Sequence, residues 1–156
     1  MIEPKPLQAV KAFHTTFQHP ILEKPQIPSA DRCQLRLALL TEELAELQQA
    51  IDKKDLVEIA DAFCDLQYVL SGAILEFGLQ GKFYELFEEV QRSNMSKACK
   101  TEEEAKETQQ YYYDKDKTES YYKEKDGLFL VYRKDDHKTL KSVNYSPANL
   151  QEILDK

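Results

Sequence analysis

The chain has 156 residues, enough for one domain with a hydrophobic core. The formal net charge of −7 predicts no basic surface for nucleic acid. The longest apolar run is shorter than the roughly 20 residues that span a bilayer, and the N-terminus lacks the pattern of a signal peptide. Three cysteines, far apart and without metal-binding spacing, indicate reduced thiols in a cytoplasmic protein: Cys33, Cys64 and Cys99.

The N-terminal third of the sequence predicts two kinds of segment. Residues 6–17 form an amphipathic pattern, with Pro6 suited to a first turn and apolar residues at helical spacing. Residues 19–28 contain three prolines and are expected to be an extended connection, because each proline disfavours helix before it.

Two longer helices are predicted next, each with a seam of apolar residues. The first begins near Ser29 or Asp31, and Asp55 caps the second after a break at residues 52–55. Seams spaced three and four residues apart predict that the helices pack as an antiparallel hairpin. The seam residues are Leu37, Leu40, Leu44, Leu47 and Ile51, then Leu56, Ile59, Phe63, Leu66 and Leu70.

The remaining sequence predicts one more core helix and a mixed C-terminal part. The third helix is expected to end near Phe77 and a fourth to cover residues 82–99. Residues 101–110 are polar all round, which predicts a solvated or frayed helical extension.

From Tyr111 onwards the composition changes and tyrosines become frequent. The segments 128–132 and 139–143 are predicted to form a β-hairpin, and Ser146 to cap a last short helix. We therefore expect an all-α fold, a bundle of four to five helices with a small C-terminal β-hairpin appendage. The predicted domains are residues 1–110 and 111–156.

The third predicted helix carries three carboxylates on one face. At about 100° per residue, Glu58, Asp61 and Asp65 fall within an arc of about 60°. Like charges on a mostly apolar helix repel and lose hydration, so such groups either take up protons or bind a cation.

The helix before it carries Glu43 and Glu46 one turn apart on a shared face. If the helices pack antiparallel, two acidic groups converge across a groove. An all-oxygen cluster suits Mg²⁺ or Mn²⁺, and no group of His or Cys competes for the ion. The simpler alternatives are a solvated helix face and interhelical ion pairs, but this face offers no basic partner.

Four segments together resemble a known superfamily: VKAFH (10–14), RLALLTEELAE (36–46), DAFCDLQY (61–68) and SNMSK (93–97). The pattern is similar to the all-α nucleoside triphosphate pyrophosphohydrolases, which include MazG, the dimeric dUTPases and phosphoribosyl-ATP pyrophosphohydrolase. It resembles the last branch most, over roughly residues 7–100. The superfamily signature is E-E-x-x-E followed by E-x-x-D. This chain has Ala62 where a glutamate is expected before Asp65, unless the second motif is Glu58 and Asp61.

The resemblance implies Mg²⁺-dependent hydrolysis of a nucleoside triphosphate, or a related nucleotide, to the monophosphate and pyrophosphate. It implies a homodimer or homotetramer with the site near the subunit interface. The implied metal ligands are Glu43 and Glu46 plus a subset of Glu58, Asp61 and Asp65. The candidate catalytic residues are Glu42 and Glu43, and the substrate-binding candidates are Arg36, Asn94 and Lys97 for phosphate and Tyr68 for a base.

Two other functions fit the same residues. A helical bundle with an acidic groove is also typical of a non-catalytic binding or scaffold protein. The alanine at position 62 also fits a relative that has lost catalysis and sequesters its substrate.

Overall fold

The computed structural model describes residues 5–156 and consists of two compact units that divide between Tyr84 and Glu85. Within the described residues there are six helices and one two-stranded antiparallel hairpin. The predicted fold class, mostly helical with a small hairpin near the C-terminus, is confirmed. The predicted domain boundary after residue 110 remains a prediction, and a helix runs across it.

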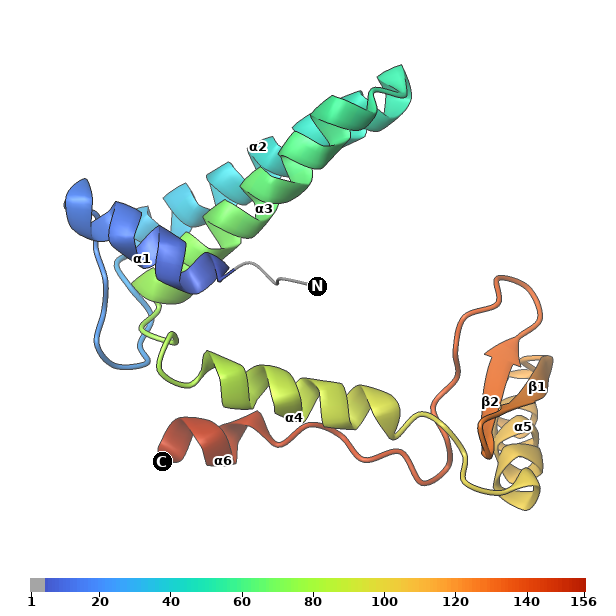
Figure 1. Cartoon of the computed structure of the whole chain (residues 1–156). Helices are drawn as coiled ribbons and strands as arrows, with labels where there is room; N and C mark the ends of the chain where they lie inside the picture. The colour runs from blue at the N-terminus through green and yellow to red at the C-terminus, as the bar shows by residue number, and fades with distance from the viewer. Residues whose placement is uncertain (1–4) are drawn as a thin grey trace. The chain divides into compact units, whose positions relative to one another are not determined.

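The first unit contains three helices: α1 (Pro6–Thr16), α2 (Ala30–Lys53) and α3 (Leu56–Glu76). Helices α2 and α3 form a long antiparallel hairpin, and α1 crosses α3 near the end away from the hairpin turn (Figure 1). The hairpin prediction is therefore confirmed.

The turn between α2 and α3 is built as the sequence predicted. Lys54 adopts a left-handed φ of 56° and ends α2. The Asp55 carboxylate then accepts hydrogen bonds from the backbone N–H groups of Val57 (3.0 Å) and Glu58 (3.2 Å), which have no partner inside the helix.

The proline-rich connection of residues 19–28 lies along the end of α3. Leu22 N–H donates to the Leu75 carbonyl (3.1 Å), and Gln26 N–H donates to that of Phe77 (3.1 Å). Gly78 follows with a φ of +67°, and a Cβ there would lie 2.0 Å from the Lys24 carbonyl oxygen. Only glycine therefore allows the chain to turn so close to this connection.

The predicted apolar seams do not face each other within the chain. On α2, Leu47 is buried, but Leu37 is 65% exposed and Leu44 is 59% exposed. On α3, Leu56 is 76% exposed and Phe63 is 56% exposed. The buried residues where the helices contact include Arg36, Leu47, Ala50 and Ala62, of which Leu47 alone belongs to a predicted seam.

The second unit contains the rest of α4 (Phe83–Met95), then α5 (Glu102–Asp116), β1 (Ser120–Lys125), β2 (Leu128–Arg133) and α6 (Leu150–Asp155). Helix α4 ends at Met95 and not at the predicted residue 99, because Cys99 pairs with β2. The N–H and carbonyl of Cys99 form hydrogen bonds with the carbonyl and N–H of Phe129, both at 2.9 Å.

The hairpin pairs β2 with β1, which the sequence did not predict. The predicted pairing of 128–132 with 139–143 is present only as a bridge between Tyr132 and Thr139, where Leu140 N–H donates to the Val131 carbonyl at 2.9 Å. The register places Tyr122 opposite Val131, and Asp126 and Gly127 form the two-residue turn with φ of 52° and 76°. Positive φ at both central residues is the preferred geometry for a hairpin connection.

Helix α5 is not the fully solvated extension that its composition predicted. Ala105 and Thr108 are completely buried, and the helix continues through the tyrosines to Asp116. Its inner face packs on the hairpin around a small core: Cys99, Ala105, Val131 and Leu140, with Tyr112, Tyr122 and Phe129 against it. The Glu104 carboxylate accepts hydrogen bonds from the Ser142 hydroxyl and from Lys100 N–H.

The last helix begins at Leu150 with Asn149 as its N-cap, later than the predicted start at Ser146. Residues 146 and 147 are held by α4 instead. Arg92 donates to the Ser146 hydroxyl oxygen and to the Pro147 carbonyl, both at 3.1 Å. None of the helices in residues 5–156 combines the length and apolar character needed to cross a bilayer.

Candidate functional site

The carboxylates predicted to converge lie on α2 and α3, the two helices of the hairpin. Glu43 on α2 is half-buried, as is Asp65 on α3, whereas Glu42, Glu46, Glu58 and Asp61 are exposed. An antiparallel pairing that sets Arg32 beside Glu76 and Arg36 beside Gly72 brings Glu43 level with Asp65.

The electrostatics of Glu43 show that these acids act on one another. Partial burial raises the pKa of the Glu43 carboxyl above its ordinary value, and the negative charge of Asp65 raises it further. Smaller contributions in the same direction come from Glu46, Glu42 and Asp61. Glu43 therefore lies close enough to Asp65 of the facing helix for that charge to disfavour ionisation of the Glu43 carboxyl.

Glu58 lies one turn nearer the hairpin tip than Asp61, in the first turn of α3. Asp65 and Asp61 are the α3 carboxylates whose charges contribute most to the Glu43 pKa. Ala62, where the superfamily pattern has a glutamate, is 4% exposed and belongs to the contact between the helices.

The acidic cluster has the chemistry of a hard-cation site without a preformed cage. In the part of the chain that the structure describes, no three His, Cys, Asp or Glu side chains gather around a common point that could hold a metal ion. Like charges repel, and a cation between facing carboxylates removes that repulsion. The all-oxygen donor set fits Mg²⁺ or Mn²⁺.

At the base of the hairpin, Glu76 forms a buried ion network that the sequence reasoning missed. Its carboxylate is fully buried and accepts hydrogen bonds from the guanidinium groups of Arg32 and Arg36. Burial alone raises the pKa of the Glu76 carboxyl, but the two arginines together bring it below its ordinary value. The available signal was two arginines one turn apart and a glutamate at the end of an apolar helix.

His14 ties α1 into this network. Its Nδ1 lies 3.0 Å from the Pro20 carbonyl oxygen, so Nδ1 carries the proton and donates. Nε2 is then free to accept from Arg36 Nη2, 3.3 Å away. Burial lowers the pKa of His14, and the nearby Arg36 charge lowers it as well, which keeps the ring neutral in this arrangement.

Gly72 makes room for the network on the same face of α3. A Cβ at this position would lie 2.7 Å from Arg36 Nη1 and 3.0 Å from His14 Nε2. One face of α3 therefore carries, in order from the hairpin tip, the carboxylates, Tyr68, this glycine and Glu76.

The predicted substrate-binding residues are distributed over both units. Arg36 is 7% exposed and engaged by Glu76 and His14, although its Nε has no hydrogen-bond partner among the described residues. Asn94 and Lys97 lie in the second unit, where Lys97 Nζ donates to the Asn94 side-chain oxygen at 2.8 Å. The pairing of these two predicted phosphate contacts agrees with their spacing of one helical turn.

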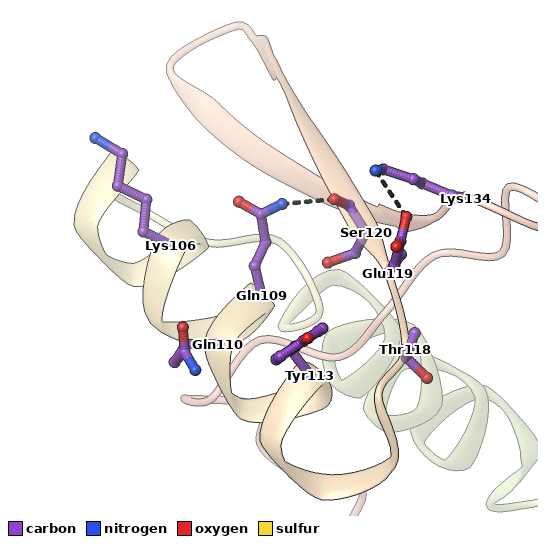
Figure 2. A pocket seen from close by; sticks show the side chains of 8 residues that line it. All are labelled: Lys106, Gln109, Gln110, Tyr113, Thr118, Glu119, Ser120 and Lys134. Atoms are coloured by element: carbon purple, nitrogen blue, oxygen red, sulfur yellow. Dashed lines mark hydrogen bonds and ion pairs between the residues drawn. The ribbon is translucent and has the colours of Figure 1, made fainter.

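A separate hollow of about 420 Å³ lies between α5 and the start of β1 (Figure 2). Gln109 donates to the Ser120 carbonyl at 2.7 Å, and Lys134 pairs with Glu119 at 2.9 Å. None of the residues predicted from the sequence as site residues lines this hollow. It is a polar depression of the second unit and not part of the acidic site.

The fold and site thus define a helical protein whose long hairpin carries acidic side chains on both of its helices. A family model described as phosphoribosyl-ATP pyrophosphohydrolase matches residues 10–94. The match covers more than half of the chain and includes all the predicted acidic residues, so the chain belongs to this family of pyrophosphate-bond hydrolases.

One curated relative is the uncharacterized protein L479 of Acanthamoeba polyphaga mimivirus, which is 40% identical over 76 residues. The aligned part is 46% of this chain and 30% of the viral protein. The chain therefore spans less than a third of that relative's length.

Proposed function

We propose that the chain is a Mg²⁺-dependent nucleotide pyrophosphohydrolase. The reaction is cleavage of a nucleoside triphosphate, or a related nucleotide, to the monophosphate and pyrophosphate. The observation that carries the proposal is the antiparallel pairing of α2 and α3, which brings Glu43 level with Asp65. The raised pKa of Glu43, caused first by burial and next by the Asp65 charge, supports this placement. The family match to residues 10–94 supports the reaction class.

In this proposal, Glu43 and Glu46 of α2 hold the cation together with Asp61 and Asp65 of α3, and Glu58 assists from the next turn. A bound Mg²⁺ supplies charge neutralisation for the phosphates and makes a nearby water more acidic. Mn²⁺ fits the same oxygen ligands. The protein residues position the phosphates and exclude other orientations, which is the main protein contribution in phosphoryl transfer.

We assign the proton-accepting role to Glu42, which is exposed beside Glu43 and free to face the attacking water. Asn94 and Lys97 stay proposed phosphate contacts on the resemblance of SNMSK (93–97) to the superfamily pattern. Arg36 acts on the phosphates by its positive charge, because the side chain is buried and its Nη2 is already engaged by Glu76 and His14.

We further propose that the chain works as a homodimer or homotetramer. Among the exposed apolar side chains of α2, Leu44 at 59% and Ile51 at 48% both line a groove of about 410 Å³. A second copy of the same hairpin would cover this apolar surface. Size-exclusion chromatography with light scattering should give a multiple of the chain mass, and Leu44→Glu should lower it. A monomeric wild-type protein would contradict this part.

The three cysteines are free, with Cys64 exposed, which agrees with the reducing environment of the cytoplasm. We therefore include a cytoplasmic location in the proposal.

The decisive experiment is pyrophosphate release from a panel of nucleoside triphosphates and phosphoribosyl-ATP, with Mg²⁺ and with Mn²⁺. Glu43→Gln should lower the rate about 100-fold or more, because it removes a charge from the cation site. The matched control is Glu23→Gln, an exposed glutamate of the same unit outside the acidic face. If no nucleotide is hydrolysed and calorimetry detects no cation binding, the groove is better explained as a binding surface for a protein partner.

A further inference from the structure

Four aromatic side chains gather where α1 crosses α3, next to the acidic face. The Phe13 ring lies 4.4 Å from that of Phe17, 5.7 Å from that of His19 and 5.6 Å from that of Tyr68, measured between ring centroids. We refer to Phe13, Phe17, His19 and Tyr68 as the aromatic cluster. His19 stacks on Phe13 at an interplanar angle of 15°, and Tyr68 meets it edge-on at 81°.

The backbone at the end of α1 is shaped to place the histidine in this cluster. Gln18 has a left-handed φ of 57°, and His19 N–H donates to the His14 carbonyl at 2.8 Å. This turn brings the His19 ring back over α1. A left-handed φ costs a non-glycine residue conformational free energy, so the surrounding contacts must stabilise this turn.

The cluster leaves aromatic surface open to solvent. Phe17 is 61% exposed, Tyr68 39% and Phe13 37%, and His19 is exposed as well. Phenylalanine rings contribute most when they are covered, so a group of them in solvent indicates a surface that binds something flat or apolar.

The position of the cluster along α3 indicates what it binds. Tyr68 follows Asp65 by three residues and Asp61 by seven, so all three share one face of the helix. At 1.5 Å per residue, Tyr68 lies about 4.5 Å further along the helix than Asp65. A nucleotide has anionic phosphates at one end and a flat base at the other. Phosphates at the carboxylates would therefore direct the base along α3 towards the rings.

We propose that the aromatic cluster is the base-binding wall of the site, with Phe17 and Tyr68 stacking on the nucleobase. This inference rests on the proposed function for the position of the phosphates. Stacking on a π-face accepts any base, so the cluster provides affinity for nucleotides as a class over phosphate compounds that lack a base.

The test compares substrates with and without a base. The variants are Phe17→Ala, Phe17→Tyr, which keeps a flat ring, and the control Tyr84→Ala, whose ring is 77% exposed outside the cluster. KM and kcat are measured for the nucleoside triphosphates and for inorganic tripolyphosphate. Phe17→Ala should raise KM for nucleotides about tenfold, with kcat and the tripolyphosphate reaction nearly unchanged. Phe17→Tyr should restore the wild-type KM.

A binding measurement keeps this inference separate from the proposed hydrolysis. Equilibrium dialysis with Mg²⁺ compares AMP, GMP, CMP and UMP with ribose 5-phosphate. Wild type should bind at least one nucleotide about tenfold tighter than the sugar phosphate, and Phe17→Ala should lose that preference. If no nucleotide is hydrolysed, the proposed function is refuted, but the dialysis still tests whether the aromatic cluster binds a base.

Three results would overturn the inference. The first is a nucleotide affinity that stays within twofold in Phe17→Ala, and the second is a wild-type protein without any preference for the base. The third is a Phe17→Ala protein of smaller mass in light scattering, which would make the ring a contact between subunits.

Discussion

Replacement of Glu76 by glutamine should destabilise the first unit strongly. The wild-type carboxylate is fully buried between Arg32 and Arg36, and glutamine keeps the shape but removes the charge. Breaking a buried ion pair typically costs about 3–5 kcal/mol, because the remaining charge stays buried. The Arg32 side chain is 28% exposed and can regain water, whereas that of Arg36 is only 9% exposed. We therefore expect a loss near the lower limit, about 3 kcal/mol.

The assay is urea denaturation followed by far-UV circular dichroism at pH 7, without divalent cations. A loss of about 3 kcal/mol shifts the midpoint of the transition by roughly 1–3 M urea. Glu88→Gln, an exposed carboxylate of α4, is the control and should change stability by no more than about 0.5 kcal/mol.

The same experiment has a defined pH dependence. The pKa of Glu76 is lowered in the folded protein, so its stabilisation is present above the unfolded value of about 4.3 and is lost as pH falls through the lowered pKa. The difference in the free energy of unfolding between wild type and Glu76→Gln should therefore become smaller below about pH 4. If the free energies of unfolding of the two proteins differ by less than about 1 kcal/mol at pH 7, the network does not stabilise the unit as we argue.

Three further changes test other parts of the first unit. Gly72→Ala should cost about 1–3 kcal/mol in urea denaturation by displacing the Arg36 guanidinium, whereas Gly81→Ala, where a Cβ meets no atom within 4 Å, should be neutral or slightly stabilising. Asp55→Ala should lower stability by about 1 kcal/mol through loss of the α3 cap, and an unchanged urea midpoint would contradict this role. In EDTA, Glu43→Gln should raise the melting temperature at pH 7–8 but not below pH 4. A raised pKa destabilises the fold as pH rises through it, so a less stable variant at pH 8 would refute the facing-carboxylate geometry.

The helices of the first unit could be predicted because their signals are local. Asp55 caps α3 through its side-chain carboxylate, and Gly78 ends it through its positive φ. The strand at 128–132 was predicted, but its main partner β1 was missed because residues 120–125 are mostly polar and lack alternation. The better signal was Asp126-Gly127, a two-residue turn that requires strands immediately on both sides.

Contacts distant in sequence explain the other differences. Ser146 was a reasonable helix cap by its type, but Arg92 of α4 uses its hydroxyl oxygen. The acidic face could be found from helical spacing alone, since Asp61 and Asp65 share a turn. The role of Glu76 was not predicted because its ion pairs are with Arg32 and Arg36 of α2. The residue pattern of α3 alone carries no sign of these partners.

The ordered face of α3 also limits how the gene for this chain can change in length. Each residue advances a helix by about 100°, so one codon inserted between Asp65 and Gly72 would rotate the acids away from α2 or unseat Glu76 from its arginines. An insertion of seven codons would restore the angle and still shift the two ends by about 10 Å. This stretch should therefore accept exchanges of residues far more readily than insertions or deletions.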